Sequence, residues 1–329
     1  MTNINSGDFL GVKVVKDCQP NGDPQRDNDA RQILNKEGIV SISDVSVKRD
    51  IRDSVLEEYS NSVAQRHPTM SVVVRAERTK DGNLLGRQGL VESVLADLGI
   101  DFSSKAGKAQ LEKIINQVFW DARTFGLVYS IKDASFHTTG PVQFGYGHSL
   151  HIVRPRFIQG IGVMPSKDER TDVESGKTNG KKAGTIWTQY IIPFGVFAIP
   201  GVVCPALAAK TGMNNDDLEV LFKHFVLGTM RRQSRSKNGQ RPVFLIHVEY
   251  HKPGFNIGYL EEGIKIKPDD DTIWLGDEAP HALKDITLDV SSLAETLSLF
   301  EKQISRVRVW HDPRLNLEGA LPGEDWKLI

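Results

Sequence analysis

Cysteine is scarce in this sequence. Among 329 residues there are two, Cys18 and Cys204, and they do not form a C-x-x-C pair. This usage excludes a disulfide framework and is typical of a protein in a reducing compartment, so we expect a cytoplasmic location. The N-terminal residues show no basic segment followed by an apolar one, which argues against a secretory signal.

The sequence also lacks an uninterrupted hydrophobic stretch that would span a membrane. Residues 191–209 carry no charge, but Pro193, Pro200 and Pro205 interrupt them at short intervals. Because proline breaks a membrane helix, we expect buried strands and a turn in this stretch, and no membrane partner.

The motifs of common catalytic and cofactor sites are missing. The chain contains no G-x-x-x-x-G-K-[ST], G-x-G-x-x-G, H-E-x-x-H or G-x-S-x-G. Their absence removes the usual sequence support for phosphate loops, dinucleotide sites, zinc proteases and hydrolases. The sequence case for an enzyme therefore starts weak, and we expect no cofactor.

What is present is the composition of a globular protein, with 39% hydrophobic and 25% charged residues, enough for about two domains or one with large insertions. The net charge is −1, but it is unevenly distributed. Residues 261–329 contain 15 acidic and 8 basic side chains, which leaves 27 acidic and 33 basic ones before them. A basic body could hold a polyanion while an acidic face meets a neighbouring copy, or both excesses could be solvated surface.

The order of expected elements predicts an α+β protein. Strand-like segments lie at 9–16, 70–75, 125–131, 142–152, 242–250 and 306–310. Helix-like segments lie at 43–59, 89–98, 108–121, 216–232 and 292–304. Strand, helix, strand, strand, helix, strand is the order of a ferredoxin-like sheet, here interrupted at 60–120 and 153–212. Such a sheet has one helix-covered face and one open face, which RNA-recognition modules use for RNA.

Two clusters of basic side chains are candidates for phosphate contacts. Lys48, Arg49 and Arg52 fall in the first turns of one helix. The second cluster follows a helix and contains no acid; it consists of Arg231, Arg232, Arg235, Lys237 and Arg241. Either cluster could bind RNA phosphates, and the second could equally be a helix end that favours cations because of the helix dipole.

Other candidates have competing explanations. Gln143, Phe144 and Tyr146 could offer hydrogen bonds and stacking to bases, although strand alternation favours the core for the two aromatic rings. Two further sets are weaker. The acidic loop with Asp17, Asp23, Asp27 and Asp29 could hold a metal ion or be a solvated turn. His247, Glu249 and His251 could ligate a metal, but a strand with one wet face explains them better.

Several strings, taken in order, carry a resemblance to one family. They are PNGDPQRDNDAR, SDVSVKRDIRDSV, DARTFG, TGPVQFGYGHSL and YIIPFGVF…PALAAKTGMNNDDL. Together they resemble the backbone subunit of the type I CRISPR surveillance complex Cascade, closest to subtypes B and C, over residues 8–250. An ordered set of strings is far more specific than any one of them.

The resemblance implies a palm with an RNA-recognition-like, ferredoxin-like sheet, a helical finger insertion and a thumb hairpin. On this basis residues 1–59 form the first half of the palm and 60–120 the finger-like insertion. The remaining boundaries are palm strands at 121–153, the thumb at 154–190, the second half of the palm at 191–310 and a C-terminal tail at 311–329. The flexible, polar segment 165–184 falls where the thumb belongs.

The family role that the resemblance implies is non-catalytic. Copies of the subunit line up along a CRISPR RNA and display it for pairing with target DNA, together with other Cascade subunits. RNA-binding residues expected from this match and from the basic clusters are Asn21, Gly22, Lys48, Arg49, Arg52, Arg123, Gln143, Phe144, Met164, Arg231, Arg232, Arg235 and Lys237. Metal-dependent cleavage of target RNA through Asp23, Asp27 or Asp29 stays open as an alternative. We also expect the acidic C-terminal part to contact a neighbouring copy.

Overall fold

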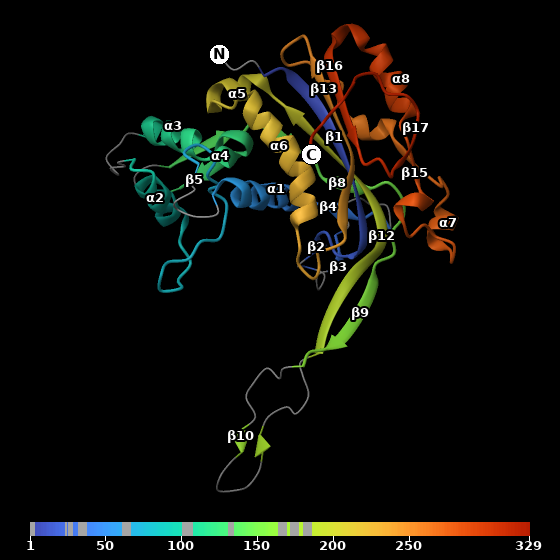
Figure 1. Ribbon diagram of the computed structural model, residues 1–329, viewed down its shortest axis with the longest axis horizontal. Coiled ribbons are helices and arrows are strands. Elements are labelled where there is room, and N and C mark those ends of the chain that lie inside the picture. The colour runs from blue at the N-terminus through green and yellow to red at the C-terminus, as the bar shows by residue number, and fades with distance from the viewer. Residues whose placement is uncertain are drawn as a thin grey trace.

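The computed structural model has a mixed α/β fold built on one large sheet (Figure 1). It describes residues 4–23, 25, 29–31, 38–60, 67–100, 108–130, 135–163, 170–171, 178–179 and 186–329. The strands of the large sheet are β1 (Ser6–Cys18), β4 (Ser41–Ile42), β7 (Val142–Phe144), β8 (Gly147–Ser149), β9 (Arg156–Ile161), β12 (Ile186–Val203), β13 (Gln240–Tyr250), β16 (Ile304–His311) and β18 (Glu324–Asp325). Their order is β18-β16-β13-β1-β12-β8-β4, and β7 and β9 also pair with β12.

Eight α-helices lie in the described residues. They are α1 (Asp44–Tyr59), α2 (Arg87–Asp97), α3 (Lys108–Val118), α4 (Trp120–Phe125), α5 (Pro205–Thr211), α6 (Asn215–Arg231), α7 (Asp271–Leu275) and α8 (Ser291–Leu299). Short strands complete the chain: β2 (Gly22–Asp23), β3 (Asp29–Ala30), β5 (Gly126–Tyr129), β6 (Phe136–Thr139), β10 (Arg170–Thr171), β11 (Thr178–Asn179), β14 (Lys265–Lys267), β15 (Thr287–Asp289) and β17 (Asn316–Glu318). None of the described helices is long and apolar enough to cross a bilayer.

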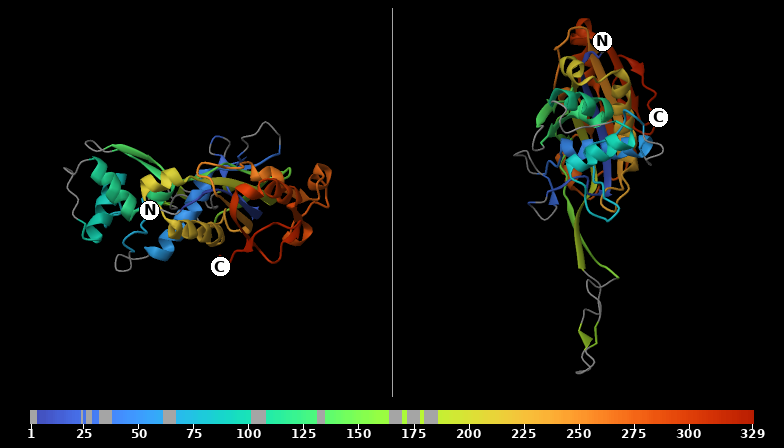
Figure 2. Two further views of the ribbon diagram at one scale, coloured as in Figure 1. Left: turned by 90° about the horizontal axis from the view of Figure 1, so that it is seen from above. Right: turned by 90° about the vertical axis from the view of Figure 1, so that its left-hand side faces the viewer.

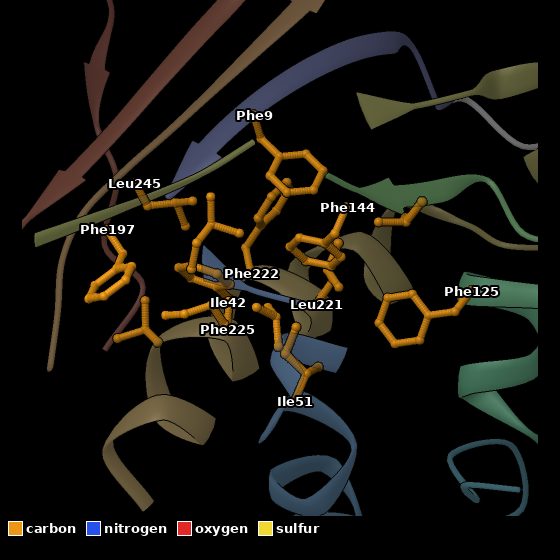
Figure 3. Close-up of a cluster of buried hydrophobic side chains, with 14 of the residues drawn as sticks. Phe9, Ile42, Ile51, Phe125, Phe144, Phe197, Leu221, Phe222, Phe225 and Leu245 are labelled. Carbon is orange, nitrogen blue, oxygen red and sulfur yellow. The ribbon is translucent and has the colours of Figure 1, made fainter. Parts of the chain in front are cut away.

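Helices α1 and α6 cover one face of the sheet. Ser43 caps α1, and Asn214 and Asp217 form a reciprocal capping box on α6. Between sheet and helices lies an aromatic core in which Phe9 contacts Phe144 and Phe222 edge to face (Figure 3). Gly228 lies so close to the Asp50 carbonyl that a Cβ there would overlap it, so glycine lets α6 approach α1.

The other face of the sheet is also covered, which corrects the expectation of an open face. Leu10, Val12 and Val248 point away from α1 and α6 and are fully buried. The segment that follows β13 supplies their cover, including Leu260, Trp274, Leu288 and Leu293. In the described residues, the large sheet therefore has no open face that could bind RNA.

The helical insertion has its own core. Residues from α2, α3 and α4, together with β5 and β6, bury Val94, Leu111, Phe119 and Tyr129. The strand expected at 70–75 is wrong, because only one isolated bridge, Ser71 to Phe119, forms there. The helix expected over 108–121 is divided, since Phe119 adopts an extended conformation between α3 and α4.

A two-stranded arm projects from the sheet. It consists of β9 and residues 186–191 of β12, paired antiparallel from Ile161 opposite Ile186 to Arg156 opposite Ile191. Figure 2 shows the arm extending away from the body. The expectation of strands and a turn at 191–209 is corrected: β12 runs through Pro193 and Pro200 as one 18-residue strand, and α5 follows. Except for Ile191, the arm lies within the predicted thumb boundaries, 154–190.

Candidate nucleic-acid interface

A cavity of about 290 Å³ lies where the arm leaves the body. Three parts of the chain meet there: the turn after β1, the first residues of β12, and the segment that joins α6 to β13. The lining includes Gln19, Gly22, Trp187, Gln189, Arg235 and Lys237. Three residues of the sequence-based set, Gly22, Arg235 and Lys237, are thus brought together, although Gly22 is more than 200 positions from the other two.

Asn21 lies next to Gly22 of this cavity but is itself buried. Its Oδ1 accepts hydrogen bonds from Ser43 N at 3.0 Å and from Ser43 Oγ at 2.7 Å, and the residue is buried. Ser46 Oγ donates to the Pro20 carbonyl at 3.3 Å. The first loop is therefore held against the N-terminus of α1, which leaves the Gly22 backbone at the cavity.

Lys237 is largely buried and makes its hydrogen bonds inside the protein. Its Nζ donates to the Pro20 carbonyl and to Ser46 Oγ. Burial lowers the pKa of Lys237 to about 8, and the carboxylate of Asp50 opposes that shift. The fully buried Lys13 lies in the same charged centre, with its Nζ 4.0 Å from Asp50 Oδ2. Lys13 and Lys237 thus both lie near the Asp50 carboxylate.

The basic helix positions of the two clusters are paired with carboxylates. Lys48 pairs with Asp44 at 2.9 Å, and Arg49 pairs with Asp53 at 2.7 Å, both one helical turn apart. Two arginines at the end of α6 pair with acids of α1. Arg232 pairs with Asp53 and Asp50, and Arg231 pairs with Glu57 and Glu58. Their RNA contacts stay predictions, and any phosphate they bind competes with these acids. The acids that pair with Arg231 and Arg232 lie on the facing helix α1, far from them in the sequence.

Arg52 and Arg123 have internal roles that the sequence did not indicate. Arg52 Nε donates to Asp121 Oδ2 at 2.9 Å, and Asp121 also accepts from the Val73 and Val74 amides. Arg123 forms a two-bond pair with Asp217. Both guanidinium groups are buried. They join α4 to α1 and α6, and neither offers an exposed group for the surface phosphate contact expected of it. RNA binding by either arginine stays a prediction.

The Gln143 region lies at the other end of β12. Val142–Phe144 pairs with Gly201–Val203, which is roughly 40 Å along the strand from Gln189. Phe144 is buried in the core, so the core alternative is confirmed for it, whereas Tyr146 is 42% exposed and the same expectation is wrong. Gln143 Nε2 donates to the Gly140 carbonyl at 2.9 Å. These residues do not join the arm-base cavity.

Two arginines that sequence reasoning missed lie beside the arm. Arg154 and Arg156 are exposed, line a cavity of about 530 Å³ with Trp274 and His281, and have no carboxylate within ion-pair distance in the described residues. The signal was present in the RPRF string at the start of the predicted thumb. Met164, another of the expected RNA-binding residues, lies outside the described residues.

The possible metal positions receive no support as a cluster. Within the described residues no group of three His, Cys, Asp or Glu side chains gathers as metal ligands. Asp23 and Asp29 are register partners in the β2–β3 pair, while Asp27 lies outside the described residues. The wet strand face expected at His247 is wrong, since the imidazole is buried against Phe222, and burial and Arg308 lower its pKa.

One family model matches residues 5–291, and it describes CRISPR-associated protein Cas7. The chain belongs to this family. The resemblance seen in the ordered strings is thereby confirmed at the level of the Cas7 family.

One relative in sequence and two solved structures match nearly the whole chain. A Haloferax volcanii protein named CRISPR-associated protein Cas7 is 28% identical over 330 residues, covering 97% of this chain and 90% of the relative. A chain of a solved "CRISPR RNA-guided surveillance complex, pre-nicking" has a TM-score of 0.55 at 12% identity, covering 98% and 96%. Another, from a "CRISPR RNA-guided surveillance complex", has a TM-score of 0.50 at 14% identity, covering 96% and 95%. At these identities the two structures establish the shared fold.

Proposed function

We propose that this protein is the CRISPR-RNA-binding backbone subunit of a Cascade-type surveillance complex. The observation that carries the proposal is the cavity at the arm base, where Gly22, Arg235 and Lys237 converge in a member of the Cas7 family. Copies of the chain would line up along the guide RNA, each using this region to contact the backbone. The guide bases would then be displayed for pairing with target DNA in antiviral defence.

The sheet order supports a ferredoxin-like palm as the centre of this subunit. Strands β13, β1, β12 and β8 are adjacent in that order, β1 is antiparallel to both neighbours, and α1 and α6 pack on one face. This is the 4-1-3-2 arrangement of a strand-helix-strand-strand-helix-strand unit. The insertion at α2–α4 then corresponds to the finger and the β9–β12 arm to the thumb. The ordered strings favour subtypes B and C.

Phosphate contacts should supply most of the affinity, largely independent of guide sequence. The exposed cations around the arm base, Arg154, Arg156 and Arg235, have no carboxylate partner in the described residues, so they can bind phosphates without first losing an ion pair. The partners we infer are the guide RNA, further copies of this chain, the other Cascade subunits and, through the guide, target DNA. With two unpaired cysteines, we place the assembly in the cytoplasm.

The test is to purify the chain from a host that expresses a CRISPR array and to sequence the nucleic acid that accompanies it. Array-derived RNA of uniform length is the expected result. Random cellular RNA, or protein free of nucleic acid even when the other Cascade subunits are present, would refute the guide-binding role.

We further propose that the subunit does not cut its target. The alternative is a metal-dependent cleavage through the acidic loop, where Asp23 and Asp29 face each other across β2 and β3. Assembled complex is incubated with complementary RNA and Mg²⁺. Intact RNA is expected, whereas periodic cleavage that disappears in Asp23→Ala, Asp27→Ala or Asp29→Ala would establish the enzymatic alternative.

A further inference from the structure

The arm has few backbone contacts that could set its direction. The pairing between β1 and β12 ends at Cys18 opposite Ile192, so residues 186–191 have β9 as their one partner strand in the described residues. A two-stranded ribbon has no third strand to limit its twisting and bending and is marginally stable by itself. Side chains must therefore hold the arm relative to the body.

Three residues, Gly160, Trp187 and Arg235, form a stack between the arm and the body. Trp187 of β12 is the register partner of Gly160 of β9. The indole ring of Trp187 lies directly over Gly160, because a Cβ at position 160 would overlap two of its ring atoms. The ring can lie flat across the ribbon only because the partner residue is glycine.

The outer face of Trp187 is covered by a residue from the body. The guanidinium carbon of Arg235 lies 3.2 Å from the centre of the ring. The segment that carries Arg235 is fixed to the end of β1 by two backbone hydrogen bonds, Gln19 N to Ser236 O at 2.7 Å and Lys16 N to Gly239 O at 2.8 Å. Arg235 therefore joins an anchored part of the palm to the arm, while its neighbours Arg231 and Arg232 pair with acids.

We propose that Arg235 is a positioning residue that sets the direction of the arm by stacking on Trp187 against Gly160. A planar guanidinium on an indole face gives both cation–π attraction and a defined parallel geometry. Arg235 and Trp187 both line the arm-base cavity, which is the RNA-contacting region of the proposed function. The consequence of the stack for RNA binding rests on that proposed function. Arm direction then determines where successive copies contact the guide.

The direct test measures the arm in the full chain without RNA. Spin labels are attached at Ile161→Cys, the exposed last residue of β9, and at Leu299→Cys, the exposed last residue of α8, in a Cys204→Ser background. Cys18 is buried and is retained. Pulsed electron resonance then reports the distribution of distances between arm and body. We expect one narrow distribution for the chain with an intact stack.

Three changes should each broaden that distribution at least twofold: Arg235→Ala, Trp187→Ala and Gly160→Ala. Gly160→Ala keeps both stacking partners and displaces the ring, so it tests the geometry by itself. Trp187→Phe keeps an aromatic face and should restore a narrow distribution. Arg241→Ala removes an exposed cation at the start of β13, six positions along the chain, and is the matched control that should leave the arm unchanged.

Unchanged distance widths in Arg235→Ala and Gly160→Ala would overturn the proposal, and because Arg235 is exposed its removal leaves no cavity that would unfold the chain. RNA binding is measured separately. If Arg235→Ala leaves the arm narrow and only lowers the salt slope of RNA binding by about 0.7, Arg235 is simply a phosphate ligand. If the arm broadens but the unmodified chain binds no guide, the positioning role stands and the proposed function fails.

Discussion

Arg123 of α4 and Asp217 of α6 form a buried, two-bond ion pair, with Arg123 Nε 2.9 Å from Asp217 Oδ2 and Nη2 2.6 Å from Oδ1. Asp217 also accepts a hydrogen bond from the Asn214 amide in the capping box of α6. One carboxylate therefore caps α6 and holds α4 beside it. The D-x-R-T-F-G string that marks the family resemblance contains one half of this pair.

Replacement of Arg123 by alanine should therefore weaken the fold before it affects RNA. Removing one partner of a buried pair leaves the other charge without compensation, which costs about 3–5 kcal/mol of unfolding free energy. Urea unfolding of Arg123→Ala measures this loss. Arg49→Ala, which breaks a partly exposed pair on α1, is the control and should cost roughly 0.3–0.5 kcal/mol. Equal losses for the two variants would contradict the internal role of Arg123.

The two unpaired arginines at the arm base should bind RNA phosphates. Because each neutralised phosphate of a single strand contributes about 0.7 to the slope of log affinity against log salt concentration, Arg154→Ala with Arg156→Ala should lower that slope by about 1.4, with little change in stability. The slope is measured by titrating guide RNA at several salt concentrations. Lys284→Ala with Lys302→Ala removes two exposed cations elsewhere and should leave the slope unchanged. A slope that does not respond to the arginine changes would exclude this contact.

His151 should make the fold sensitive to acid. Its Nε2 accepts from the Val196 amide and its Nδ1 contacts the Ile152 carbonyl, which requires a neutral imidazole. Burial lowers its pKa from 6.5 to about 4. The unfolded chain then binds a proton between about pH 6.5 and 4 that the folded chain does not, so stability falls as the pH decreases through this window. Two and a half pKa units correspond to a loss of about 3 kcal/mol by pH 4.

The measurement is urea unfolding at pH 7, 6 and 5 for the unmodified chain and for His151→Gln. Glutamine can donate and accept hydrogen bonds but does not titrate. The unfolding free energy of His151→Gln should therefore fall less over the same pH range than that of the unmodified chain. His224 and His247 titrate equally in both proteins, and the difference between the two curves isolates His151. Parallel curves would show that His151 is not responsible.

The close approach of α1 and α6 predicts a packing defect in Gly228→Ala. The added methyl group would overlap the Asp50 carbonyl, so the helices must separate, at a cost of about 1–3 kcal/mol. Thermal unfolding measures the change. Gly86→Ala, whose Cβ would meet nothing within 4 Å, should change the melting temperature much less. A wild-type melting temperature for Gly228→Ala would show that the two helices adjust without strain.

The acidic C-terminal part still stands as a predicted contact with a neighbouring copy, but deletion after Val290 cannot test it. That deletion would remove β16, which pairs with β13 in the main sheet, and Trp326, which packs on Phe222. Asp277→Asn with Glu278→Gln neutralises two exposed acids instead. Weaker assembly on RNA is expected, seen by analytical ultracentrifugation, and Asp81→Asn is the control. Undiminished assembly would place the contact elsewhere.

The sequence by itself determined the local elements. Ser43 and Asn214 mark helix starts because their side chains bond to amides within three residues, and the apolar periods of α1 and α6 are equally local. The ordered strings also indicated the family. By contrast, Phe119 interrupts an apparently continuous helix, and Pro200 lies inside a strand, because tertiary pairing outweighs local preference at both places.

Tertiary structure decided which charges are free. Arg52, Arg123, Arg231 and Arg232 look alike in the sequence as exposed cations, but Asp121, Asp217 and the acids of α1 compensate them from distant positions. Arg154, Arg156 and Arg235 are left without carboxylates at the arm base within the described residues. Periodicity and capping depend on neighbours within one or two helical turns, whereas ion pairing depends on which distant segments the fold brings within a few ångströms. For that reason the family could be inferred from the sequence, and the interface required the fold.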